Sequence, residues 1–187
     1  MADIDDATRQ GLKRYYLLRA GVSAAWIVAA VTLGAANPLA GGLLLVAYPA
    51  WDALANALDA RANGGFAANP PQTLNLVISL AVAAAVVFAL QTDPRRVLTV
   101  FGVWAGFAGL LQLAAGVRRW RGLGAQWPMV LSGAQSALAG GVFVTQSLGA
   151  GPHQPTILII APYAGFGAVY FLAAGVALAL KARKRAA

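Results

Sequence analysis

The chain has 187 residues, of which 59% are hydrophobic and only 11% charged, and its formal net charge is +8. A soluble domain has about 25% charged residues, so this composition excludes a protein whose whole surface faces water. The chain has no cysteine and one histidine, which excludes disulfides, thiol nucleophiles and thiolate metal sites. We therefore expect a membrane protein that is not an enzyme and that has no cofactor or metal.

Six apolar stretches approach the length of about 20 residues that a membrane-spanning helix needs. In chain order they are Tyr15–Ala36, Leu39–Leu58, Thr73–Leu90, Val97–Val117, Pro128–Leu148 and Thr156–Leu180. The predicted fold is all-α: one integral membrane domain of six transmembrane helices over 15–180. A short cytoplasmic segment over 1–14 precedes it, and a basic cytoplasmic tail over 181–187 follows it.

The basic residues predict the orientation. If the N-terminus lies inside, the outer side holds only Arg95 and Arg96, and the inner side holds the other twelve basic residues. Cytoplasmic loops are enriched in Lys and Arg, so we expect a bacterial inner-membrane protein with both termini in the cytoplasm. These basic residues lie at the ends of apolar runs, which favours anionic lipid headgroups as their partners and not nucleic acid.

The six stretches group into three helical hairpins over 15–61, 73–121 and 128–181. Each hairpin has an outer turn that contains proline, and each ends inside at basic residues. The three turns are Asn37-Pro38, Asp93-Pro94 and Gln154-Pro155. Because every hairpin enters from the same side, the repeats are parallel and related by an axis along the membrane normal.

Several short motifs resemble the HdeD family of small bacterial acid-resistance membrane proteins. The motifs are Leu18-Arg19-Ala20-Gly21, the Asn37-Pro38 turn with Asp52 after it, Phe101-Gly102-Val103-Trp104, and Gln126-Trp127-Pro128 with the residues that follow. The resemblance extends over about 15–180. It implies a six-helix inner-membrane protein with a link to acid or envelope stress, an unknown mechanism and no catalytic residues.

Asp52 is the most informative residue, because a carboxylate near the centre of a membrane helix costs about 2.5–3.5 kcal/mol. Folding the first hairpin about residue 37 places Arg19 opposite residue 55, within one turn of Asp52. In one interpretation the pair fastens the first helix to the second. In the other it forms part of a proton or ion relay. The first is favoured because no second buried acid is expected.

Tyr48, Asp52 and Asn56 are spaced at i, i+4 and i+8, so they share one helix face that could line a polar cavity. Asp59 continues this face, and the alternative interpretation places Asp59 in water at the inner helix end. The only histidine, His153, lies in the last outer loop and is a candidate pH sensor. Exposed loop histidines are usually inert, so the interpretation that His153 has no sensing role also stays open.

A face of small residues on the fourth stretch predicts close helix packing. It contains Gly102, Gly106 and Gly109. The sequence leaves open whether the packed neighbour belongs to the same chain, to a second copy of it in a homo-oligomer, or to another membrane protein.

Three functions remain as alternatives. The first is a non-enzymatic stress protein of the HdeD type. The second is a channel or transporter for a small solute or ion, which the polar face around Asp52 favours. The third is an accessory subunit of a larger membrane complex, for which the small-residue faces are suited.

Overall fold

The computed structural model describes residues 6–123, 126–149 and 157–186, and every regular element within these ranges is helical. The elements are α1 (Asp6–Ala29), its π-helical continuation η1 (Ala30–Gly34), α2 (Pro38–Ala62), α3 (Pro70–Thr92), α4 (Arg96–Leu123), α5 (Trp127–Leu148) and α6 (Ile157–Ala186). Within the described residues, six helices are long and apolar enough to cross a membrane. The prediction of an all-α protein with six such helices is confirmed.

The helices extend further than the apolar stretches that predict them. α1 begins at Asp6, within the segment expected to precede the membrane domain, and α6 continues to Ala186, through most of the expected basic tail. Hydropathy marks the part of a helix that faces lipid, whereas the helix ends where a cap or a breaking residue intervenes. At the first turn, the Asn37 side chain accepts hydrogen bonds from the backbone of Leu39 and Ala40 at 2.9 and 3.1 Å.

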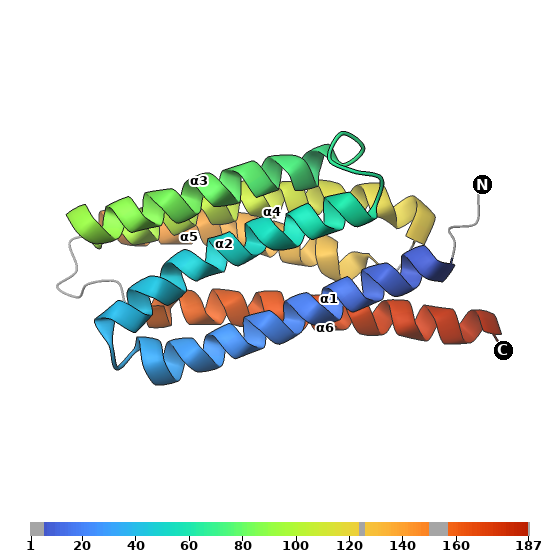
Figure 1. Cartoon of the computed structure of the whole chain (residues 1–187), viewed down its shortest axis with the longest axis horizontal. Helices are drawn as coiled ribbons and strands as arrows, with labels where there is room; N and C mark the ends of the chain where they lie inside the picture. Colours follow the sequence, from blue (N-terminus) through green and yellow to red (C-terminus); the bar gives the residue numbers. More distant parts are fainter. Residues whose placement is uncertain (1–5, 124–125, 150–156, 187) are drawn as a thin grey trace.

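The six helices form a ring in chain order, which α1 and α6 close by packing against each other (Figure 1). The most extensive packing joins α4 to α5, α2 to α3 and α6 to α1. Each of these pairs links two different predicted hairpins. By contrast, α1 and α2 diverge from their connecting turn toward the end of the bundle that holds both termini.

Glycines allow the close packing of α4 on α5. A Cβ atom added at Gly109 would lie 2.6 Å from the carbonyl oxygen of Gly133, and one added at Gly140 would lie 2.5 Å from the carbonyl oxygen of Gly102. A Cβ atom at Gly106 would meet nothing within 4 Å. Gly102 and Gly109 therefore pack against α5 of the same chain, which answers the question that the sequence leaves open.

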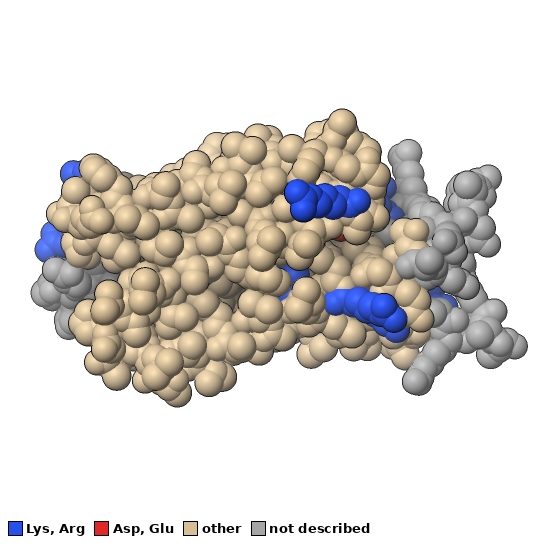
Figure 2. All heavy atoms as spheres, viewed as in Figure 1, with Lys and Arg blue, Asp and Glu red and all other residues tan. Residues whose placement is uncertain are grey.

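The outer surface is apolar, as a lipid-facing surface must be. Leu39, Leu138 and Leu148 are 73–79% exposed, and on the face in Figure 2 the basic side chains lie mostly toward the two ends. Inside, a large apolar cluster that includes Trp26 and Phe101 fills the end with the α1–α2 turn. A smaller one that includes Phe171 lies nearer the termini. Polar side chains occupy the interior between them.

Candidate functional site

The carboxylate of Asp52 is the centre of a buried network that joins three helices. Arg19 on α1 forms an ion pair with it. Asn75 and Ser79 on α3 donate hydrogen bonds to its Oδ2 atom at 2.8 and 3.0 Å, and Asn56, one turn along α2, donates to the same atom at 3.1 Å. Asp52 thus connects α2 to α1 and α3, and its charge is balanced within the bundle.

The network around this ion pair extends to two further helices, α4 and α6. The Trp104 indole nitrogen donates to Ser79 Oγ at 2.9 Å, which brings α4 into the network. The Arg19 guanidinium donates to the Tyr15 hydroxyl at 3.0 Å and lies 4.2 Å from the ring centre of Phe171 on α6. The arginine is therefore fixed by three kinds of contact, with a carboxylate, a hydroxyl and an aromatic face.

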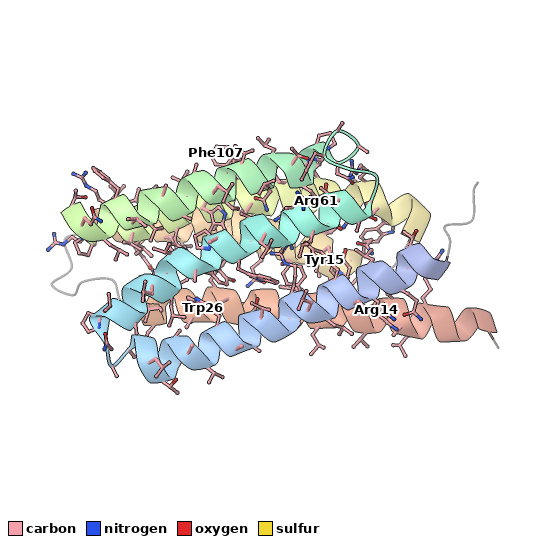
Figure 3. All side chains as sticks on the ribbon, in the orientation of Figure 1. Arg14, Tyr15, Trp26, Arg61 and Phe107 are labelled. Atoms are coloured by element: carbon pink, nitrogen blue, oxygen red, sulfur yellow. The ribbon has the colours of Figure 1, made fainter. Side chains whose placement is uncertain are left out.

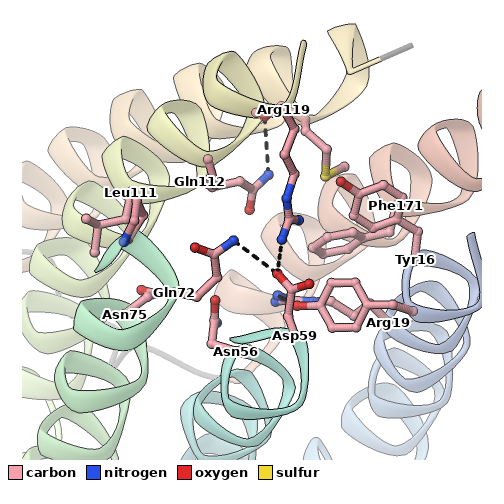
Figure 4. Close-up of a pocket in the computed structure, with 15 residues that line it drawn as sticks. Tyr16, Arg19, Asn56, Asp59, Gln72, Asn75, Leu111, Gln112, Arg119 and Phe171 are labelled. Carbon is pink, nitrogen blue, oxygen red and sulfur yellow. Dashed lines mark hydrogen bonds and ion pairs between the residues drawn. The ribbon is translucent and has the colours of Figure 1, made fainter. Parts of the chain in front are cut away.

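A second buried acid, Asp59, lies further along the same face of α2. Its side chain is 4% exposed and forms an ion pair with Arg119 of α4 at 2.7 Å. Gln72 donates to its carboxylate at 3.2 Å (Figure 4). Asn63 also donates to it, at 2.8 Å. The alternative interpretation that places Asp59 in water is therefore wrong, and so is the expectation that Asp52 is the only buried acid. α4 continues beyond its apolar run, so that Arg119 reaches back into the bundle.

A small cavity lies between the two acids, which are seven residues and therefore about 10 Å apart along α2. Its walls include Arg19, Asn56 and Asn75 on the side of Asp52, and Asp59 and Arg119 on the other side (Figure 4). Its volume is about 40 Å³. We call it the lower cavity, because it lies nearer the termini.

A second cavity, the upper cavity, lies on the other side of Asp52. Tyr48, Trp51, Ser136 and Tyr163 are among the residues of its wall, and its volume is about 50 Å³. One water requires about 10–15 Å³ on this measure, and benzene enters an engineered cavity of about 150 Å³. Each cavity therefore has room for a few waters or for a molecule of a few heavy atoms.

The two cavities share part of their walls, and aromatic rings close the upper one. Arg19, Asn75, Gln112 and Phe171 line both cavities. Tyr48 packs against Trp26 with ring centres 4.7 Å apart and against Trp104 at 5.6 Å, and Tyr163 packs against Phe143 at 5.8 Å. These rings separate the upper cavity from the large apolar cluster, so the polar interior is closed on that side.

Three buried polar atoms have no hydrogen-bond partner among the described residues. They are Arg19 Nε, Trp51 Nε1 and Asn75 Oδ1. All three residues line the upper cavity. Leaving a buried donor or acceptor unpaired costs about 1–3 kcal/mol. Trp51 lines only the upper cavity, whereas Arg19 and Asn75 line both cavities. Two unpaired donors and one unpaired acceptor on these walls therefore favour a small hydrogen-bonding molecule in the polar interior.

The predicted polar face on α2 is divided between the two cavities. Tyr48 and Asp52 line the upper cavity, whereas Asn56 lines the lower one. The candidate pH sensor, His153, lies outside the described residues. Within the described ranges, no group of three or more His, Cys, Asp or Glu residues could hold a metal ion.

Sequence reasoning missed the contribution of α3. Gln72, Asn75 and Ser79 are spaced at i, i+3 and i+7, so they form one buried polar stripe on an otherwise apolar helix. This periodicity is visible in the sequence and could have identified α3 as a wall of the site.

No family model, curated protein or solved structure matches the chain. The likeness to the HdeD family therefore rests on the sequence motifs alone.

Proposed function

We propose that this chain is a non-enzymatic membrane transport protein that carries a small, neutral, hydrogen-bonding solute through the polar interior of its helix bundle. The observation that carries the proposal is the set of three unpartnered polar atoms on residues that line the upper cavity, Arg19, Trp51 and Asn75. A bound solute that accepts two hydrogen bonds and donates one would satisfy all three.

The charges of the interior favour a neutral solute over an ion. Asp52 is paired with Arg19, and Asp59 is paired with Arg119, so each carboxylate is already neutralised. A cation would have to compete with an arginine for its carboxylate, and an anion would have to compete with an aspartate. A neutral molecule can use the unpartnered atoms without separating either pair.

Passage requires a change of conformation, because aromatic rings close the upper cavity toward the large apolar cluster. This observation favours a transporter that opens alternately to the two sides of the membrane, and it does not favour a permanently open channel. Tyr48 and Tyr163 are the inferred gate, since both line the cavity and both belong to the ring cluster.

The test is solute flux into proteoliposomes, with water, urea and glycerol as probes. Trp51→Phe removes the unpartnered indole N–H and no protein hydrogen bond. We expect the variant to fold normally and to slow the flux of the transported probe about two- to tenfold, as for one lost hydrogen bond. Trp127→Phe is the matched control, because Trp127 is 49% exposed and lines neither cavity.

Three outcomes count against transport. They are wild-type flux equal to that of empty liposomes for all three probes, an unchanged flux in Trp51→Phe, and an equal loss in Trp127→Phe.

We also infer that the chain lies in the bacterial inner membrane as three parallel hairpins with cytoplasmic termini. The support is the excess of basic residues on the side of the termini. A reporter enzyme that is active only in the periplasm, fused to the C-terminus, should be inactive. An active reporter would reverse the orientation.

The HdeD-like motifs favour a role in acid or envelope stress, in which transport of the solute would help the cell to survive. Deleting the gene should lower survival after an acid challenge, and Trp51→Phe should restore survival less well than Trp127→Phe. The accessory-subunit hypothesis has less support, because Gly102 and Gly109 of the α4 glycine face pack against α5 of the same chain.

A further inference from the structure

The divergence of α1 from α2 leaves a groove that is separate from the two axial cavities. The groove has a volume of about 670 Å³ and lies at the end of the bundle that holds the termini (Figure 1). This volume is within the range of about 300–1,000 Å³ of pockets that hold drug-sized ligands. The groove is thus far larger than either axial cavity, and a different class of ligand fits it.

The wall of the groove is mainly apolar. Gly11 and Leu18 contribute from α1, and Leu58 and Ala62 contribute from α2. Leu18 is 48% exposed and Leu58 is 42% exposed. In a membrane, these side chains face acyl chains and do not face water.

One basic side chain lines the groove, and a second lies on α2 next to a residue of its wall. Arg14 of α1 lines it, and Arg61 lies three residues beyond Leu58 on α2. Both arginines are exposed, and Figure 3 shows them on the two helices that border the groove. The one acid in its wall, Asp59, is buried and already paired with Arg119. The accessible charge at the groove is therefore positive.

We propose that the α1–α2 groove binds one anionic phospholipid. Arg14 and Arg61 bind the headgroup phosphate, and an acyl chain lies along Leu18 and Leu58. A zwitterionic lipid has the same chains but no net negative charge. The two arginines therefore give the site a preference for an anionic lipid over a zwitterionic one. The proposal requires only that α1 and α2 lie in a membrane, and it does not depend on solute transport.

The experiment is native mass spectrometry of the full chain with phosphatidylglycerol or phosphatidylcholine added to the detergent. We expect one tightly bound phosphatidylglycerol and no equally tight phosphatidylcholine. One basic residue near an anionic lipid surface contributes about fivefold to affinity, so Arg14→Gln with Arg61→Gln should weaken binding about 25-fold. The control pair is Arg95→Gln with Arg96→Gln, two exposed arginines at the opposite end.

A second variant tests the groove without changing its charge. A Cβ atom at Gly11 would meet nothing within 4 Å, so Gly11→Leu should fold and fill the groove. It should abolish the tight phosphatidylglycerol. Gly21→Leu is the matched control, because Gly21 is equally open, is also exposed, and lies on α1 outside the groove.

An equal loss of phosphatidylglycerol binding in the Arg95→Gln, Arg96→Gln control would overturn the proposal, since it would show a general attraction of the lipid to positive charge. Equal binding of phosphatidylcholine, or full binding in Gly11→Leu, would also overturn it. Solute flux measured on the same proteins separates this proposal from transport. Wild-type protein that binds no phosphatidylglycerol tightly but still carries solute would overturn the lipid site and leave transport standing.

Discussion

Removing the Asp52 carboxylate should destabilise the bundle more than removing both members of its ion pair. In Asp52→Ala, Arg19 keeps its contacts with Tyr15 and Phe171 but loses its only carboxylate partner among the described residues. Breaking a buried ion pair on one side costs about 3–5 kcal/mol. The hydrogen bonds from Asn75 and Ser79 add about 1 kcal/mol, since interhelical bonds in membranes average about 0.6 kcal/mol each.

The expected loss of unfolding free energy in Asp52→Ala is therefore about 4–6 kcal/mol. The double variant Arg19→Met with Asp52→Ala removes the uncompensated cation and keeps an apolar side chain against Phe171. It should be about 2–3 kcal/mol more stable than Asp52→Ala, because a buried pair can be replaced by apolar residues at little cost. Reversible unfolding in mixed micelles with increasing SDS measures the two single variants, Asp52→Ala and Arg19→Met, and the double variant. If the double variant loses as much unfolding free energy as the two single variants together, the reasoning is refuted, because the two charges would then be uncoupled.

Two further predictions concern helix packing and the second acid. Gly109→Ala should lower the unfolding temperature in detergent, because its Cβ atom would lie 2.6 Å from the backbone of α5 and overpacking costs about 1–3 kcal/mol. Gly106→Ala is the control and should leave that temperature unchanged or higher, so equal losses in both would contradict the packing. Arg119→Met should cost about 3–5 kcal/mol by leaving Asp59 without its ion pair, measured by the same unfolding assay. A loss below about 1 kcal/mol, typical of exposed pairs, would show that Asp59 is not buried as described.

The sequence predicts the six helices because each needs an apolar outer face in lipid, and hydropathy detects that face directly. It also places Arg19 near Asp52, because a tight turn at residue 37 determines which residues of α1 and α2 lie opposite each other. This geometric argument needs only one hairpin. It works because the two residues are 33 positions apart, with a single turn between them.

The pairing of Asp59 with Arg119 could not be predicted in the same way. The two residues are 60 positions apart, and their contact depends on how α4 packs beside α3 in the ring, which brings Arg119 across the interior to α2. In the sequence, both lie at the ends of apolar runs, where charged residues usually face water. The order of the helices around the ring is set by tertiary packing, including the glycine contacts between α4 and α5, and no single helix contains that information.

The most direct test of the polar interior is the exchange of tryptophan indole hydrogens with deuterated water, followed by NMR in micelles. The Trp51 indole has no partner among the described residues and lines the upper cavity. The Trp26 indole donates to the carbonyl oxygen of Leu44 at 2.8 Å inside the apolar cluster. We predict that Trp51 exchanges much faster than Trp26 and that its resonance shifts on addition of the transported solute. A Trp51 indole as slow to exchange as Trp26, and unmoved by water, urea or glycerol, would contradict a solute-binding cavity at the centre of the bundle.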